Sequence, residues 1–193
     1  YKGKILIIDD DLINSKLMEK ILLKLKHEVY TANNGQEALN ALNESIYDLI
    51  LLDIIMPDIN GIELLQQIKK NKKYYATPII MLSGLDDLDS IVDCINLGAN
   101  DYITKPIDKV LLNARINNCL ERKEYRDKEK EYLNKIKKED KKNNDLLLNI
   151  MPANIAERLK SGESNIADRF SDVSVLFADI SGFTEYSSNI SPK

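Results

Sequence analysis

The most constraining feature of this sequence is a run of large apolar residues, 49–52, that ends at a single carboxylate, Asp53. The run is too short to span a membrane and lacks the polar alternation of a half-exposed strand. It predicts the central strand of a parallel sheet that helices cover on both faces. Ligands of such sheets bind beyond the carboxyl ends of the strands, which is where Asp53 lies.

Four further segments are expected to be strands, two of them short, and they alternate with segments of helical periodicity. The other expected strands cover residues 4–8, 28–32, 79–82 and 101–104. The expected helices cover residues 13–25, 36–43, 62–68, 88–97 and a segment from about 108 onward, because apolar residues recur there at helical spacing. Five such alternations predict right-handed crossovers and an α/β fold with a doubly wound, five-stranded parallel sheet.

Polar side chains stand at the ends of four expected strands. They are the Asp9 and Asp10 pair, Asp53, Ser83 and Lys105. In a parallel sheet these ends meet at one edge, where several carboxylates repel one another unless a cation lies among them. Oxygen ligands without His or Cys suit Mg²⁺. A carboxylate nucleophile, a hard metal, an ammonium and a hydroxyl together favour phosphoryl-transfer chemistry.

Composition restricts the class of protein further. The chain has 193 residues and a net charge of −4, which does not indicate a nucleic-acid partner. No signal peptide or long apolar segment is visible, so we expect a cytoplasmic protein with no membrane segment. The chain begins at Tyr1 rather than Met and stops just after Ile-Ser-Pro, so we expect a piece of a longer protein.

Four segments together resemble the response-regulator receiver domain of two-component systems. They are Ile5-Leu-Ile-Ile-Asp9-Asp10, Leu51-Leu-Asp53-Ile-Ile-Met-Pro57-Asp58-Ile-Asn-Gly61, Leu82-Ser83-Gly84 and Gly98-Ala-Asn-Asp-Tyr102-Ile-Thr-Lys105-Pro106. Their order and spacing match the family, which makes the combination far more specific than any one motif. The resemblance implies a receiver domain over residues 1–120, with a flavodoxin-like fold and strand order 2-1-3-4-5.

The resemblance also implies a role for each acidic residue at this edge. Asp53 would be the phosphoacceptor. Asp10, Asp53 and the carbonyl of Ile55 would hold Mg²⁺, and Asp9 would help through a water molecule. A cognate histidine kinase or phosphotransfer protein would supply the phosphoryl group, which adds about 1.5 to 2 negative charges at one strand end.

Three further residues would respond to that charge. Lys105 would pair with the phosphoryl oxygens, Ser83 would move to bond them, and Tyr102 would move with Ser83 as an aromatic switch. An ordinary half-buried tyrosine is the alternative for Tyr102. His27, the only histidine, is expected to be a favourable charge near a helix C-terminus rather than a phosphorelay residue.

Residues 121–145 are dense in charges of both signs and contain no Gly or Pro. Opposite charges at helical spacing indicate that this segment extends the last receiver helix outward. A thin apolar heptad seam, with interruptions at Glu139 and Asn143, is formed by Tyr125, Tyr132, Ile136, Leu146 and Ile150. A linker over residues 121–147 that forms a parallel two-stranded coiled coil is one interpretation, and a solvated single helix or flexible linker is the other.

The tail predicts a short helix followed by a strand. Pro152 ends the long helix or starts the next, residues 155–159 are expected to be helical, and Ser161-Gly162 stops that helix. Residues 173–178 are the expected strand, which ends at Asp179. A carboxylate beside a glycine turn at a helix N-terminus suits metal and phosphate chemistry, and a capped turn without function is the alternative.

Residues 147–163 and 166–184 resemble the entry to a class III nucleotide cyclase domain, here a truncated stub over residues 148–193. The resemblance implies that Asp179 and the carbonyl of Ile180 bind Mg²⁺ or Mn²⁺. It also implies a turn that cradles a nucleoside triphosphate, formed by Gly182, Phe183 and Thr184. The remaining catalytic residues would follow Lys193, so this chain alone is expected to be catalytically incomplete.

These expectations describe a phosphorylation-dependent response regulator whose output is an attached class III cyclase, with conversion of ATP to cAMP favoured over GTP to cGMP. Such cyclase sites form between two subunits, so the parent protein is expected to be a homodimer. Two alternatives stay open: a non-enzymatic receiver switch that gates dimerisation or partner binding, and a receiver within a larger hybrid kinase.

Overall fold

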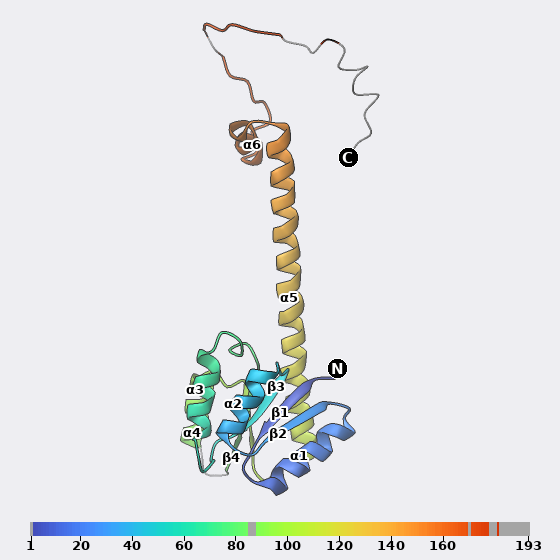
Figure 1. The fold of residues 1–193 in the computed structure, drawn as a ribbon, viewed down its shortest axis with the longest axis vertical. Coiled ribbons are helices and arrows are strands. Elements are labelled where there is room, and N and C mark those ends of the chain that lie inside the picture. Colours follow the sequence, from blue (N-terminus) through green and yellow to red (C-terminus); the bar gives the residue numbers. More distant parts are fainter. Residues whose placement is uncertain (1, 85–87, 170, 178–180, 182–193) are drawn as a thin grey trace. The chain divides into compact units, whose positions relative to one another are not determined.

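A computed structural model describes residues 2–84, 88–169, 171–177 and 181 of the chain (Figure 1). Five strands form one parallel sheet in the order β2-β1-β3-β4-β5. The strands are β1 (Lys4–Ile8), β2 (Glu28–Ala32), β3 (Leu49–Asp53), β4 (Ile79–Ser83) and β5 (Asp101–Thr104). The predicted doubly wound sheet and its strand order are therefore confirmed.

Four helices connect successive strands, two more follow the last strand, and side chains cap the start of α1, α2 and α3. They are α1 (Leu12–Lys24), α2 (Gly35–Glu44), α3 (Gly61–Lys70), α4 (Leu88–Asn96), α5 (Lys109–Ile150) and α6 (Ala153–Lys160). The Asp11 carboxylate accepts a 2.8 Å hydrogen bond from the Ile13 N–H, and Asn60 accepts from Ile62 at 2.9 Å. These caps satisfy backbone donors that an α-helix leaves free in its first turn.

The sheet separates two apolar layers because side chains alternate across each strand. Leu49 and Leu51 of β3 face the layer formed with α1 and α5, whereas Ile50 and Leu52 face the layer formed with α2, α3 and α4. All four side chains are fully buried, and each contributes about 1.5–3 kcal/mol by leaving water. The central strand is thus held from both faces, which fixes the position of Asp53 at its end.

His27 corrects one prediction made from the sequence. Its side chain is only 5% exposed, and its Nδ1 accepts a hydrogen bond from the Gly3 N–H at 3.2 Å. Burial lowers the pKa of this imidazole, since desolvation disfavours the charged form. The expected favourable charge near a helix C-terminus is therefore wrong, and His27, between α1 and β2 in the chain, is a buried hydrogen-bond acceptor for Gly3.

The long helix predicted after the last strand is present as α5, and the chain divides into two compact units, residues 1–136 and 137–193. The predicted heptad residues on α5 are all exposed in the single chain, and their pairing with a second copy stays a prediction. Among the helices that the structure describes, none is both long enough and apolar enough to cross a membrane.

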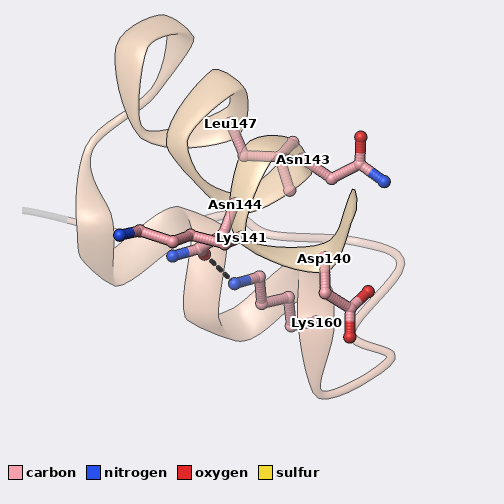
Figure 2. A pocket seen from close by; sticks show the side chains of 6 residues that line it. All are labelled: Asp140, Lys141, Asn143, Asn144, Leu147 and Lys160. Carbon is pink, nitrogen blue, oxygen red and sulfur yellow. Dashed lines mark hydrogen bonds between the residues drawn. The ribbon is translucent and has the colours of Figure 1, made fainter. Parts of the chain in front are cut away.

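The second unit contains α6, which confirms the predicted helix and its end near Gly162, where φ is +88°. Figure 2 shows a hollow in this unit, with a volume of about 610 Å³, and the ammonium of Lys160 donating to the Asn144 side chain. The hollow is lined by Asp140, Lys141, Asn143, Asn144, Leu147 and Lys160. With one apolar residue in this lining, the hollow lacks the apolar character of a typical small-molecule site.

The tail after α6 departs from its prediction. Residues 173–177 form no strand, and Val173, Val175, Leu176 and Phe177 are exposed. A strand needs a neighbour to satisfy its N–H and C=O groups, and no part of the described chain pairs with this segment. The expected strand is therefore wrong over residues 173–177, and its last residue, 178, lies outside the described residues.

Candidate functional site

Three carboxylates meet at the carboxyl edge of the sheet, as the strand ends predicted. Oxygen atoms of Asp9, Asp10 and Asp53 all lie within 4.8 Å of one another. Asp9 and Asp53 are buried, at 0% and 5% exposure, whereas Asp10 is exposed. Asp9 and Asp10 follow β1 and Asp53 ends β3, and these two strands are paired in register from Ile5 to Ile8. Their parallel pairing is what brings the three acids together.

Lys105 supplies the one ammonium that the described residues place against these acids. Its Nζ donates to Asp53 Oδ2 at 2.6 Å and lies 3.1 Å from Asp9 Oδ2. Lys105 follows β5, two strands away from β3, and reaches the site because its backbone N–H donates to the Ser83 carbonyl at the end of β4, at 2.7 Å. The lysine therefore crosses the end of β4 to reach the central carboxylate.

The charges at this edge are not balanced. Burial raises the pKa of Asp9 and of Asp53, because desolvation disfavours the carboxylate and the nearby lysine offsets this only in part. Burial lowers the pKa of Lys105, but its hydrogen bond and charge interaction with Asp53 outweigh this and leave the pKa raised. Three carboxylates face one ammonium, so the site has an excess of acidic groups whose charge a divalent cation would neutralise.

Orphaned polar atoms at this edge fit a metal and a phosphoryl group. Among the described residues, Ser83 Oγ is buried without a hydrogen-bond partner, and the buried Asp9 Oδ2 has only the Lys105 ammonium, 3.1 Å away, beside it. Buried polar groups without partners are rare in native proteins and point to an absent ion, water or ligand. An all-oxygen set of this kind suits Mg²⁺.

The other predicted site residues are Tyr102, Ile55 and a group in the tail. Tyr102 lies half-buried on β5 and packs against the apolar layer of α2, α3 and α4. Ile55, whose carbonyl is a predicted metal ligand, has a side chain that is 67% exposed. Residues outside the described part of the chain include Asp179, Ile180, Gly182, Phe183 and Thr184.

Gly61 is a site residue whose role was not predicted from the sequence. A Cβ at this position would lie 1.9 Å from the backbone oxygen of Asp53, and the Gly61 N–H donates to the Ile54 carbonyl at 2.8 Å. The start of α3 therefore packs directly against the end of β3 that carries Asp53. A glycine at the first position of a helix, where other residues are better helix formers, was the available signal.

Comparison with known proteins agrees with this geometry. A family model described as the response regulator receiver domain matches residues 5–117. A solved CheY-like receiver domain protein from Methanospirillum hungatei is 32% identical with a TM-score of 0.61, and the match covers 65% of this chain and 99% of that one.

Two curated relatives extend the comparison. "Probable transcriptional regulator ycf27" of Guillardia theta is 39% identical over 121 residues, 63% of this chain. "3',5'-cyclic-nucleotide phosphodiesterase regA" of Dictyostelium discoideum is 36% identical over 148 residues, 75% of this chain. The match spans 46% of the first relative and 19% of the second, so each is much longer than the shared region. The fold, the acidic edge and these matches show that this chain belongs to the response regulator receiver domain family.

Proposed function

We propose that this chain is a phosphorylation-dependent switch in which Asp53 is the phosphoacceptor. Receiver domains bind Mg²⁺ at the phosphorylation site and interact with histidine kinases or phosphotransfer proteins. The observation that carries the proposal is the 2.6 Å contact between Lys105 Nζ and Asp53 Oδ2 inside a cluster of acids. Asp10, Asp53 and the Ile55 carbonyl would hold the metal, with Asp9 acting through water.

The chemistry needs few groups. An Asp53 oxygen attacks the phosphorus of a phosphohistidine donor, a P–O bond forms, the P–N bond breaks, and the imidazole leaves with the electron pair. Mg²⁺, when bound, offsets the charge of the carboxylates and of the incoming phosphoryl oxygens. Lys105 transfers its hydrogen bond from the carboxylate to a phosphoryl oxygen. The unpartnered Ser83 hydroxyl donates to another, and Tyr102 moves into the space that Ser83 leaves.

We further propose that the output of the parent protein is a class III nucleotide cyclase, with ATP to cAMP as the favoured reaction. The support is the cyclase-like sequence over residues 147–163 and 166–184. The regA relative, which is named as a cyclic-nucleotide phosphodiesterase, is a second line of support, because it joins a similar region to cyclic-nucleotide chemistry. In the parent, Asp179 and the Ile180 carbonyl would bind Mg²⁺ or Mn²⁺. Gly182, Phe183 and Thr184 would cradle the triphosphate across a homodimer.

A receiver that gates a partner without an attached enzyme is the second candidate. The ycf27 relative carries the name of a transcriptional regulator and shares the same region. The two candidates differ in what the parent protein does, not in the chemistry at Asp53.

The first experiment tests the phosphoacceptor on the 193-residue chain. Incubation with phosphoramidate and Mg²⁺ should add one phosphoryl group, seen by intact mass, that hydroxylamine removes because it is an acyl phosphate. Asp53→Asn should abolish the addition and Asp58→Asn should retain it. A phosphoryl group that persists in Asp53→Asn would refute the assignment.

The second experiment tests the output on the full-length parent. Cyclase rates with ATP and with GTP are compared with and without beryllofluoride, which mimics the phosphoryl group on Asp53. A change that is lost in Asp53→Asn supports the receiver-gated cyclase, whereas no cyclase activity in any condition favours the non-enzymatic switch.

A further inference from the structure

Two lysine–aspartate pairs join β3 to the β5–α5 part of the chain, one at each end of the strand. At the carboxyl edge Lys105 contacts Asp53 at 2.6 Å. At the opposite, amino edge Lys123 Nζ lies 3.0 Å from Asp48 Oδ1, and Asp48 immediately precedes β3. Figure 1 shows α5 running beside this sheet within the receiver. The strand that carries the proposed phosphoacceptor is thus tied at one end to the segment just before α5 and at the other end to α5 itself.

The acceptor at the amino edge is itself fixed. Asp48 Oδ2 accepts the Lys4 N–H at 2.9 Å, and the Asp48 N–H donates to the Lys4 carbonyl at 2.7 Å. Lys123 is well covered, with 16% of its side chain exposed. One helical turn further on, Arg126 donates to the Ala76 carbonyl at 2.5 Å, in the loop that leads to β4. We call the Lys123 and Arg126 contacts the amino-edge seat.

The seat continues the face of α5 that packs on the sheet. Buried apolar residues on this face are Leu112, Ile116 and Cys119, and the next positions at the same spacing are Lys123 and Arg126. The last buried apolar residue on this face is Leu120, which lies so close to Gly3, just before β1, that a Cβ on Gly3 would be 3.0 Å from Leu120 Cδ2. Polar contacts hold α5 for six residues more, which is about 9 Å of helix at 1.5 Å per residue.

We propose that Lys123 and Arg126 are positioning residues that hold α5 at the amino edge, so that a change at Asp53 and Lys105 tilts the helix about this seat. The inference rests on the proposed function and names the route by which phosphorylation of Asp53 would affect α5. Lys105 lies four residues before Lys109, where α5 begins. When Lys105 follows a phosphoryl oxygen away from the carboxylate, the start of α5 moves with it. The buried strand β3 does not deform, because close-packed cores transmit displacement instead of absorbing it.

The test is hydrogen exchange of the 193-residue chain, with and without beryllofluoride plus Mg²⁺. The variant is Lys123→Met. The matched control is Lys128→Met, which also removes one lysine of α5 but breaks only a surface pair with Glu124. Lys123 Nζ also lies 2.6 Å from Asp127 Oδ2 on the same helix, a pair comparable to the Lys128–Glu124 pair that the control removes. Lys123→Met should speed exchange of amides 121–130 by about five- to tenfold relative to the control, because the contact with Asp48 no longer opposes local opening. Amides 112–119 should change less than about twofold, and the control should resemble the wild type.

The measurements with beryllofluoride distinguish the proposed function at Asp53 from the coupling through the amino-edge seat. In the wild type, residues 49–56 should become protected and the exchange of residues 121–130 should change. In Lys123→Met the protection of 49–56 should persist while the response of 121–130 disappears. Protection at 49–56 without any response at 121–130 in the wild type would refute only the role of the amino-edge seat. Exchange rates in Lys123→Met that equal those of the control would refute it as well. Absence of protection at 49–56 overturns the proposed function and the coupling with it.

Discussion

Gly61 and Asp53 are in direct backbone contact, so closely that a Cβ on Gly61 would lie 1.9 Å from the Asp53 carbonyl oxygen. The obstructing atom belongs to the backbone of a buried central strand and cannot rotate away. The first turn of α3 and the proposed phosphoacceptor are therefore positioned by one another.

Gly61→Ala should destabilise the receiver by about 2–3 kcal/mol, the usual cost of forcing an atom into a packed core. It should also displace Asp53 and slow its phosphorylation by phosphoramidate. Urea unfolding and intact mass measure the two effects. Glu63→Ala is the control, an exposed substitution in the same helical turn that removes a favourable first-turn charge but introduces no clash. A Gly61→Ala variant as stable as this control would contradict the contact.

Lys105→Met should destabilise the protein in the absence of divalent cations, since it leaves two buried carboxylates without their cation. The expected loss is roughly 2–3 kcal/mol, below the full cost of breaking a buried pair because Lys105 is partly exposed. Urea unfolding in EDTA measures it, with Lys109→Met as a control at an exposed position. Saturating Mg²⁺ should shrink the difference, and a loss independent of Mg²⁺ would argue against charge balance as its cause.

Asp10→Asn should weaken Mg²⁺ binding by about tenfold or more while leaving the metal-free fold intact, because Asp10 is exposed. The measurement is the rise in melting temperature with Mg²⁺, since a ligand that binds only the folded state stabilises it. Asp93→Asn, which removes an exposed acid on α4, should keep the wild-type response. An unchanged Mg²⁺ titration in Asp10→Asn would remove Asp10 from the metal site.

His27 should make stability depend on pH. Its pKa is lowered in the folded protein, so below the unfolded value of about 6.5 the unfolded chain binds more protons. The contribution of His27 is complete above that pH and is lost as the pH falls, by at most about 1.4 kcal/mol per pH unit. His27→Asn keeps an acceptor for the Gly3 N–H but does not titrate. Urea midpoints at about pH 7.5 and 5.5 should therefore fall more steeply in the wild type, and equal slopes would refute the prediction.

Much of the receiver was predictable because its signals are local. Apolar runs identified β1, β3 and β4, and a parallel sheet necessarily brings strand ends such as Asp9 and Asp53 to one edge. Apolar residues at helical spacing identified the helices, because that periodicity is a local property of the sequence. The short helix after Pro152 was predictable from the proline before it and from the Ser161-Gly162 stop after it.

The sequence by itself determined the order of strands and helices, the acids at the carboxyl edge and the continuity of α5, since each follows from residues close in the chain. Only the tertiary structure decided that His27 is buried, that Gly61 touches Asp53, and that Lys123 meets Asp48 across 75 residues of chain. It also decided that residues 173–177, despite a strand-like pattern, form no strand among the described residues. The reason is that burial, close approach and strand pairing depend on which partner arrives from elsewhere in the chain, and local patterns do not carry that information.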